Sequence, residues 1–320
     1  MIFMNILIDP LLFLQALRGA TGGIFNSFFV FCSIFGEDMP IIILIAIVYW
    51  CLDKKLGQYL LVSLAGAALV NGLAKVAACI YRPWILDSRV KPVQEAIAGA
   101  TGYSFPSGHT TTATTLFGGI ALRGKISKGL KIVLIACFVL VGFSRNYLGV
   151  HSVPDVIIAI IFTFIVLIIT SKLFDKLEEN PKLDIVISCV GIIISILILI
   201  FTLTKSYPMD YDSLGRLIVD PAIMAIDTFA YVGLAVGVFL SWPIERRFVK
   251  FSTDGSLEEK VLRCICGFIS LEFINTVIMP LFGKNFLGGF LQYALLMIFV
   301  TLIFPAIIKF FQNRKENNSV

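Results

Sequence analysis

Long apolar runs recur from one end of this chain to the other, and they restrict its fold more than any other feature. Nine of them approach or reach the length needed to cross a bilayer: residues 39–52, 58–80, 107–122, 131–146, 154–171, 183–204, 219–242, 261–282 and 286–310. A hydrocarbon core about 30 Å thick requires roughly 20 helical residues at 1.5 Å each. We therefore predict an all-α, polytopic transmembrane bundle of about nine spans, in which the three short runs extend into their flanking polar residues.

The composition excludes a soluble globular protein. Of 320 residues, 58% are hydrophobic and 15% are charged, against roughly 25% charged in soluble domains. The net charge of +5 comes from short clusters between apolar runs rather than from a basic stripe, so a nucleic acid partner is not expected.

The basic residues predict the orientation of the chain. Loops on the cytoplasmic side carry an excess of Lys and Arg, and five alternate connecting segments hold 17 of the 26 basic residues: 53–57, 123–131, 172–182, 245–263 and 309–320. This bias places the N-terminus outside and the C-terminus inside the cytoplasmic membrane.

Polar breaks divide the chain into four predicted regions. Asp9, Pro10 and Arg18 interrupt the apolar start, so residues 1–36 are interpreted as interfacial N-terminal helices. Residues 37–172 form a core rich in polar junctions, residues 183–310 form an additional and more uniformly apolar bundle, and residues 311–320 form a cytoplasmic tail.

Two carboxylates lie inside the predicted spans of the second half. Asp227 and Glu272 either mark a substrate or ion pathway or form hydrogen bonds that help the helices pack. The outer loop 205–220 is in a position to cover a site at the outer surface.

Three polar clusters fall at the same predicted outer surface. In the first, Lys75 and Arg82 are seven residues apart, which predicts one helical face two turns long, and Pro83 then ends the helix. A lysine in an apolar span is a functional candidate, although a lysine near a helix end also reaches the interface by snorkelling.

The second cluster, Ser104 to Thr110, precedes an apolar run. Ser107 is a suitable N-cap and Gly108 leaves the backbone amides open, so this helix N-terminus predicts an anion site. An ordinary cap beside a solvated His109 is the alternative interpretation.

The third cluster runs from Ser144 to Asp155. Pro154 suits the first turn of a helix, which places Asp155 within reach of His151. A carboxylate beside an imidazole orients the ring and stabilises its cation, leaving the other ring nitrogen free to attack. A capping ion pair at the bilayer surface is the simpler alternative.

The joint occurrence of the clusters favours chemistry. The chain has only two histidines, and both lie in these clusters. Three cations, Lys75, Arg82 and Arg145, would surround a dianion, and the histidines would supply a nucleophile and a proton donor. Such a site suits phosphoryl transfer without a metal or other cofactor.

The motifs K-x6-R-P, P-S-G-H and S-R-x5-H-x3-D, here Lys75 to Pro83, Pro106 to His109 and Ser144 to Asp155, resemble those of the type 2 phosphatidic acid phosphatase superfamily, which includes vanadium haloperoxidases. The resemblance covers about residues 37–172. It implies that His151 attacks phosphorus, that Asp155 orients it and that His109 protonates the leaving alcohol. It also implies a set of phosphate-binding residues: Lys75, Arg82, Ser107, Gly108 and Arg145.

These observations predict an integral membrane lipid phosphatase acting on a lipid phosphomonoester or pyrophosphate at the outer face, with the lipid and the bilayer as its partners. Phosphatidic acid, phosphatidylglycerol phosphate and undecaprenyl pyrophosphate are all candidate substrates. One alternative is a lipid phosphotransferase of the same superfamily. Another is a transporter-like protein that only binds lipid, but binding does not require a paired nucleophile and acid.

Overall fold

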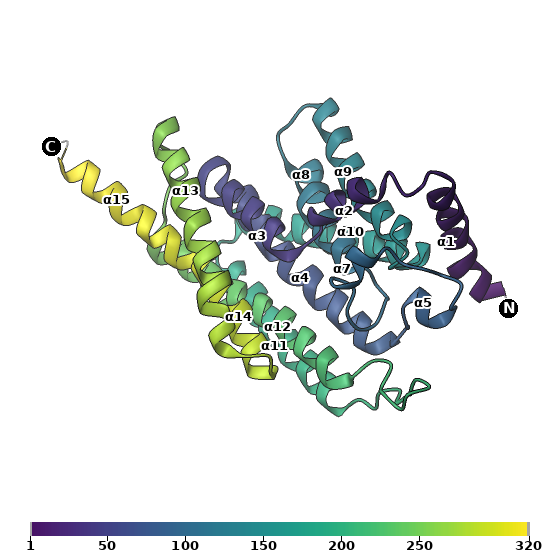
Figure 1. Ribbon diagram of the computed structural model, residues 1–320. Coiled ribbons are helices and arrows are strands. Elements are labelled where there is room, and N and C mark those ends of the chain that lie inside the picture. The colour runs from purple at the N-terminus through teal and green to yellow at the C-terminus, as the bar shows by residue number, and fades with distance from the viewer. Residues whose placement is uncertain (1, 319–320) are drawn as a thin grey trace. The chain divides into compact units, whose positions relative to one another are not determined.

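The computed structural model describes residues 2–318, which are helical apart from turns and loops and one isolated bridge between Tyr211 and Leu217. Figure 1 traces the helices in chain order. The α-helices are α1 (Ile2–Ala20), α2 (Asn26–Ile34), α3 (Asp38–Ile47), α4 (Lys54–Ala78), α5 (Pro83–Leu86), α6 (Gln94–Ile97), α7 (Gly108–Ala113), α8 (Gly119–Arg123), α9 (Lys128–Tyr147), α10 (Val153–Glu179), α11 (Leu183–Thr204), α12 (Pro221–Ile244), α13 (Leu257–Phe273), α14 (Phe286–Ile298) and α15 (Phe304–Asn318). Short π-helical segments adjoin several of them: η1 (Val48–Leu52), η2 (Thr114–Gly118), η3 (Glu245–Val249), η4 (Ile274–Ile278) and η6 (Phe299–Ile303), with a 3-10 turn at η5 (Met279–Phe282).

The transmembrane bundle predicted from the sequence is confirmed as an all-helical membrane fold, but the count of nine spans is not. Within residues 2–318, seven helices are long and apolar enough to cross a bilayer: Lys54–Leu86, Lys128–Tyr147, Val153–Glu179, Leu183–Thr204, Pro221–Val249, Leu257–Phe282 and Phe286–Asn317. An eighth span arises if α2 and the run α3–η1, which meet at a bend of 52°, are taken together. The chain is therefore a multi-pass membrane protein with seven or eight candidate spans over this range.

The predicted span 107–122 corresponds to the continuous helical run α7–η2–α8, which is too short to be counted. Ser107 caps its start, accepting a hydrogen bond from the Thr110 amide, and Gly124 ends it in extended backbone. The run carries buried threonines (Thr110, Thr111, Thr112, Thr114 and Thr115), which mark an interior helix rather than a lipid-facing one.

Burial separates inner helices from lipid-facing ones. In the most apolar stretch of the span that starts with α4, 72% of residues are buried, whereas in the span that starts with α13 only 17% are. Side chains such as Val261, Ile265 and Ile269 are exposed on α13, and apolar exposure of this extent suits contact with lipid tails. Lys75, near the C-terminal end of α4, is held inside the protein.

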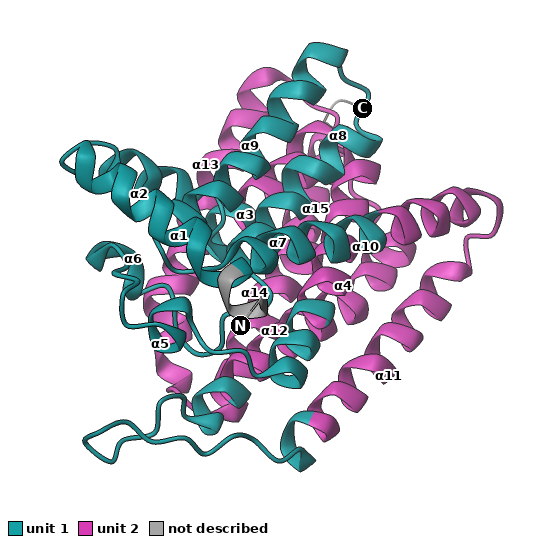
Figure 2. Cartoon of the chain, turned by 90° about the vertical axis from the view of Figure 1, so that its right-hand side faces the viewer, with its two compact units in different colours: residues 1–41, 70–167, 202–225 teal, residues 42–69, 168–201, 226–320 magenta. Residues whose placement is uncertain are grey.

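The chain forms two compact units that interleave along the sequence (Figure 2). Unit 1 comprises residues 1–41, 70–167 and 202–225, and unit 2 comprises residues 42–69, 168–201 and 226–320. Residue 1 and residues 319–320 of the predicted tail lie outside the described residues, while residues 311–318 continue α15. The four regions predicted from the sequence are contiguous segments (1–36, 37–172, 183–310 and 311–320), whereas each unit draws on three separated segments.

Each unit has its own packing. In unit 1, α9 packs against α1, α2, α7 and α8. In unit 2, the buried Trp50 indole donates a hydrogen bond of 2.9 Å to the Val300 carbonyl and contacts the Phe304 ring. Gly267 is required beside this indole, because a Cβ there would come within 2.3 Å of Trp50.

Candidate active site

All of the predicted catalytic and phosphate-binding residues lie in unit 1, whereas Asp227 and Glu272 lie in unit 2. The prediction that Lys75 and Arg82 share one helical face is wrong. Helix α4 ends at Ala78, Cys79 adopts a φ of +52°, and Arg82 has extended backbone ahead of Pro83. Pro83 therefore begins α5 instead of ending α4. The turn nevertheless brings both cations into the same buried region.

Lys75 is only 7% exposed, so it does not snorkel to the surface. Its ammonium donates hydrogen bonds to the carbonyls of Tyr103, at 3.1 Å, and Pro106, at 3.2 Å. These carbonyls belong to the loop that leads into α7. Lys75 thus anchors the loop that carries the second motif.

Arg82 joins three separate segments of unit 1. Its guanidinium donates to the carbonyls of Gly102, at 3.1 Å, and Thr101, at 2.7 Å. Its Nη1 lies 3.0 Å from the carbonyl oxygen of Val150 and 2.9 Å from Nε2 of His151. Because the guanidinium has no lone pair to offer, Nε2 accepts this last hydrogen bond.

The second motif starts helix α7, and the predicted N-cap role of Ser107 is confirmed. The Ser107 hydroxyl accepts hydrogen bonds from Thr110, and the Ser107 amide donates to the Asp155 carbonyl at 3.1 Å. Gly108 and His109 follow as the first residues of α7. A Cβ at Gly99 would lie 4.0 Å from Nε2 of His109, so the loop before the motif passes beside this imidazole.

The third motif turns back on itself at the end of α9. Gly149, with a φ of +75°, lets the chain reverse, and the amides of Val150 and His151 then donate to the Arg145 carbonyl. The side chain of Asn146 donates to the His151 carbonyl at 2.9 Å. These contacts place the backbone of His151 beside that of Arg145.

Arg145 is a buried cation with unused donors. Its side chain is 2% exposed, and Nη1 donates to the Ser33 hydroxyl. Nε and Nη2, however, have no hydrogen-bond partner. Leaving charged donors buried and unpaired is costly, and an anion with several oxygens would satisfy both.

His151 faces a carboxylate and a hydroxyl through its other nitrogen. Nδ1 lies 3.6 Å from Oδ2 of Asp155 and 3.4 Å from Oγ of Ser104. Asp155 accepts hydrogen bonds from Ser104 Oγ at 2.6 Å and from the Ser152 amide at 2.7 Å. The predicted proximity of Asp155 to His151, with Pro154 in the first turn of α10, is confirmed.

Ser104 was not assigned a role by the sequence. It lies 47 residues before His151 in the chain, and its only sequence signal is its place in the second cluster.

Burial lowers the pKa of His151 well below its ordinary value, and the positive charge of Arg82 lowers it further. Asp155 acts in the opposite direction but less strongly. His151 is therefore neutral at physiological pH, with a proton on Nδ1 facing Asp155 and the lone pair on Nε2. A neutral imidazole oriented in this way is able to act as a nucleophile.

The loop 205–220 supports this region from within the same unit. The Tyr81 hydroxyl donates to Asp210 at 2.7 Å, and the Lys205 ammonium donates to the carbonyls of Val76 and Ala77. Tyr103 packs with residues of the same loop. The loop therefore contacts the segment between Lys75 and Arg82 and the side chain of Tyr103.

The site is built for an anion. It gathers the cations Lys75, Arg82 and Arg145 with two imidazoles and one carboxylate. Across residues 2–318, no three His, Cys, Asp or Glu side chains converge in an arrangement that would hold a metal ion. The arrangement suits transfer of a phosphoryl group to an imidazole.

Two family models match the chain. The model of the PAP2 superfamily matches residues 57–179, and the model of the transmembrane extension of PAP2 superfamily phosphatases matches residues 229–316. The chain belongs to the PAP2 superfamily. The first match contains every candidate site residue, and the second accounts for most of the additional bundle, for which the sequence motifs offered no counterpart.

Three proteins are similar to part of the chain. The chain is 35% identical over 97 residues to phosphatidylglycerophosphatase B of Bacillus subtilis, a match covering 28% of this chain and 47% of the relative. It is 32% identical over 135 residues to undecaprenyl-diphosphatase of Sulfolobus acidocaldarius, covering 41% and 62%. It is 28% identical over 159 residues to sphingosine-1-phosphate phosphatase 1 of Rattus norvegicus, covering 48% and 36%.

In each case the chain spans less than two thirds of the length of the relative. No solved structure matches the chain.

Proposed function

We propose that this PAP2 protein is an integral membrane lipid phosphatase, which hydrolyses a lipid phosphomonoester or pyrophosphate through a phosphohistidine at the outer face of the cytoplasmic membrane. The observation that carries the proposal concerns Arg145. Two of its buried side-chain donors have no partner, and its carbonyl accepts a hydrogen bond from the His151 amide, so these donors belong to a residue beside the proposed nucleophile. The names of the three relatives also support a phosphorylated lipid as substrate.

In the first step, Nε2 of His151 attacks phosphorus. The hydrogen bond from Arg82 Nη1 occupies the lone pair of Nε2 in the structure, so phosphate binding has to redirect this donor to a phosphoryl oxygen. A P–N bond forms as the P–O bond to the lipid breaks, and His109 passes a proton to the departing oxygen. Burial and the positive charge of Arg145 lower the pKa of His109 well below its ordinary value, so the negative charge of the bound phosphate has to keep this imidazole protonated for the step. Asp155 stabilises the positive charge that develops on the ring.

In the second step, water attacks the phosphohistidine. His109, now neutral, takes a proton from this water, the P–N bond breaks, and inorganic phosphate leaves with His151 restored. Lys75, Arg82, Arg145 and the amides near Ser107 hold the phosphoryl oxygens in both steps, because their charges match the transition state.

The first experiment measures phosphate release. Purified protein is given phosphatidic acid, phosphatidylglycerol phosphate or undecaprenyl pyrophosphate, with EDTA present and no acceptor lipid. Release from at least one substrate supports a metal-independent hydrolase. If no phosphate is released, the assay is repeated with an added acceptor lipid, and transfer to that lipid would instead identify a phosphotransferase. Activity restored only by a divalent ion would overturn the metal-free mechanism.

The second experiment separates the two histidines by leaving group. A general acid contributes roughly 10²–10⁴-fold when the leaving oxygen is an alkoxide, whereas nitrophenolate leaves without a proton. His109→Ala should therefore reduce turnover of the lipid substrate by at least about 100-fold and turnover of p-nitrophenyl phosphate far less. His151→Ala should abolish both, because the phosphoenzyme cannot form.

Ser152→Ala is the matched control, since the Ser152 hydroxyl has no hydrogen-bond partner. Retention of p-nitrophenyl phosphate turnover by His151→Ala, with loss in His109→Ala, would exchange the two roles.

A further inference from the structure

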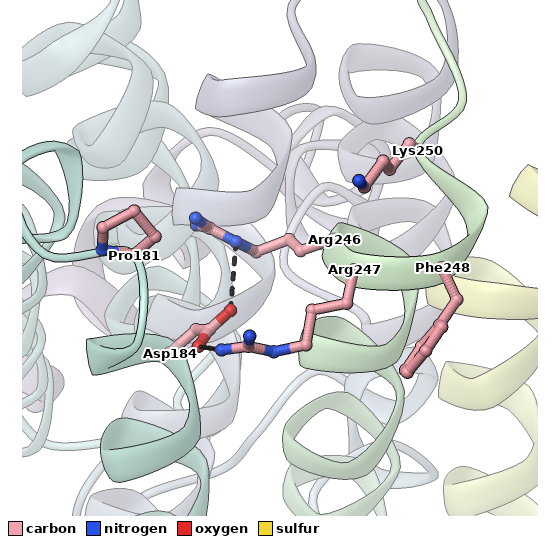
Figure 3. Close-up of a pocket in the computed structure, with 6 residues that line it drawn as sticks. All are labelled: Pro181, Asp184, Arg246, Arg247, Phe248 and Lys250. Atoms are coloured by element: carbon pink, nitrogen blue, oxygen red, sulfur yellow. Dashed lines mark hydrogen bonds and ion pairs between the residues drawn. The ribbon is translucent and has the colours of Figure 1, made fainter.

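A second cationic cavity lies in unit 2, where the sequence analysis assigned no site. Figure 3 shows the side chains around it. It has a volume of about 460 Å³, within the range of roughly 300–1,000 Å³ typical of small-ligand pockets. Its lining consists of Pro181, Asp184, Arg246, Arg247, Phe248 and Lys250.

Two chain segments far apart in sequence form this cavity. One is the turn into α11, which carries Asp184 in its first turn. The other is η3, which continues α12 and ends where Lys250 takes a left-handed conformation with a φ of +51°. The apolar sequences of α11 and α12 do not predict that the start of α11 contacts η3. The sequence alone therefore does not reveal the cavity.

Asp184 fixes two arginines at the cavity. Its side chain is 2% exposed, and its oxygens pair with Arg247 Nη2 at 2.5 Å and with Arg246 Nε at 3.3 Å (Figure 3). The Arg246 guanidinium also lies 5.5 Å from the ring centre of Trp242, as a cation–π contact. Both guanidinium groups are thus held in place before any ligand binds, which reduces the entropy lost on binding.

The charges at the cavity do not cancel. Three cations and one carboxylate line it, and the neighbouring Glu245 is bound elsewhere, to Lys54 at 2.6 Å and Gln58 at 3.1 Å. In addition, the buried Nε of Arg247 has no hydrogen-bond partner. The cavity therefore carries excess positive charge and an unused charged donor, as an anion site does.

We infer that this cavity binds the phosphate-bearing headgroup of an anionic membrane lipid. A lipid is favoured over a free anion because Phe248, which lines the cavity, is 79% exposed and offers an apolar surface to acyl chains. The cavity also lies at the end of the span Pro221–Val249, where headgroups are found. No histidine lines it, and its one carboxylate, Asp184, is paired with two arginines, so we expect lipid to bind there without turnover.

The test uses full-length protein in mild detergent and native mass spectrometry to measure retained lipid. The probes are phosphatidylglycerol, zwitterionic phosphatidylcholine and inorganic phosphate. Arg247→Gln and Lys250→Gln are the test variants, because Arg246 continues to pair with Asp184 in both. Arg314→Gln is the matched control: Arg314 is exposed on α15 and does not line the cavity.

Wild type and Arg314→Gln should retain phosphatidylglycerol in preference to phosphatidylcholine. Each test variant should lose about fivefold in apparent affinity, the equivalent of the loss of one cation near a membrane surface. Turnover of p-nitrophenyl phosphate should be unchanged in all variants, which shows that they fold. The lipid measurement does not depend on that turnover, so it tests the cavity even if the chain proves not to be a phosphatase.

Equal retention of the two lipids by wild type, or equal loss in Arg314→Gln, would overturn the proposal. Saturation by inorganic phosphate, with no further retention of phosphatidylglycerol, would identify a free anion as the ligand and overturn the assignment to a lipid.

Discussion

The hydrogen bonds of Arg82 and Arg145 distinguish two kinds of buried cation in one site. Arg82 donates hydrogen bonds to three backbone carbonyls and to His151. Arg145 leaves two of its nitrogen donors unpaired. Under the proposed function, Arg82 holds the site together before substrate arrives, whereas Arg145 is held ready for the substrate. Neither residue type nor motif position distinguishes these two roles.

At the same scale, Ser104 is expected to orient the catalytic pair. Ser104→Ala removes the hydroxyl that bonds Asp155 at 2.6 Å and lies beside Nδ1 of His151, while the Ser152 amide still holds the carboxylate. We expect kcat for p-nitrophenyl phosphate to fall roughly tenfold, which corresponds to about 1.4 kcal/mol. Ser152→Ala removes a neighbouring hydroxyl without a partner and should change little. Equal effects of the two substitutions would contradict the orienting role.

The charge state of His151 leads to a prediction on pH. Burial and Arg82 disfavour the imidazolium, so the pKa of His151 lies below the ordinary value of about 6.5 and the ring stays neutral as the pH falls through that value. Nitrogen NMR of histidine-labelled protein measures this. Because the chain has two histidines, His109→Gln leaves a single signal. A titration midpoint at or above 6.5 would show that Asp155 outweighs burial and Arg82.

At the scale of elements, the helix ends and the turns beyond them bring the motif residues together. Helix α4 ends before Arg82, and α9 ends before the turn that carries His151. Cys79, just after α4, and Gly149, just after α9, both have positive φ values, which turn the chain away from the helix axis. The fixed spacings within the motifs are therefore distances across a helix end followed by a turn, rather than distances along one helical face.

Gly149 tests this interpretation. An alanine there would adopt a left-handed conformation, which costs about 1–2 kcal/mol, and its Cβ would lie 3.2 Å from the backbone of Pro92. Gly149→Ala should lower the thermal midpoint and reduce phosphatase turnover. Gly129→Ala is the matched control: no atom lies within 4 Å of a Cβ at this position near the start of α9, and alanine favours a helix. It should leave the midpoint unchanged or raise it.

At the scale of the whole molecule, the orientation in the membrane is a prediction from the distribution of basic residues. Exposed positions report it: single cysteines replacing Ser88 and Ser213 should react with an impermeant thiol reagent in intact cells. Cysteines replacing Lys125 and Asn313, also exposed, should react only after the cells are lysed. The seven native cysteines are removed first. The reverse labelling pattern would place the site on the cytoplasmic side.

The sequence by itself determined the membrane fold and the family, and it predicted the class of site. These follow from local properties: the length of an apolar run, a serine before a helix, a proline in a first turn, and three motifs with fixed spacing. The predicted count of nine spans is not confirmed, because the apolar pattern does not distinguish the short run 108–123, with its buried threonines, from a lipid-facing helix.

Only the tertiary structure decided which side-chain donors form hydrogen bonds and which remain without a partner. Ser104 reaches Asp155 across 51 residues, and Arg247 reaches Asp184 across 63. Hydrogen bonds depend on distances of a few tenths of an ångström, and those distances are set by how the helices pack, which no local pattern encodes. The unpaired donors of Arg145 and Arg247, on which both proposals rest, become visible for the same reason.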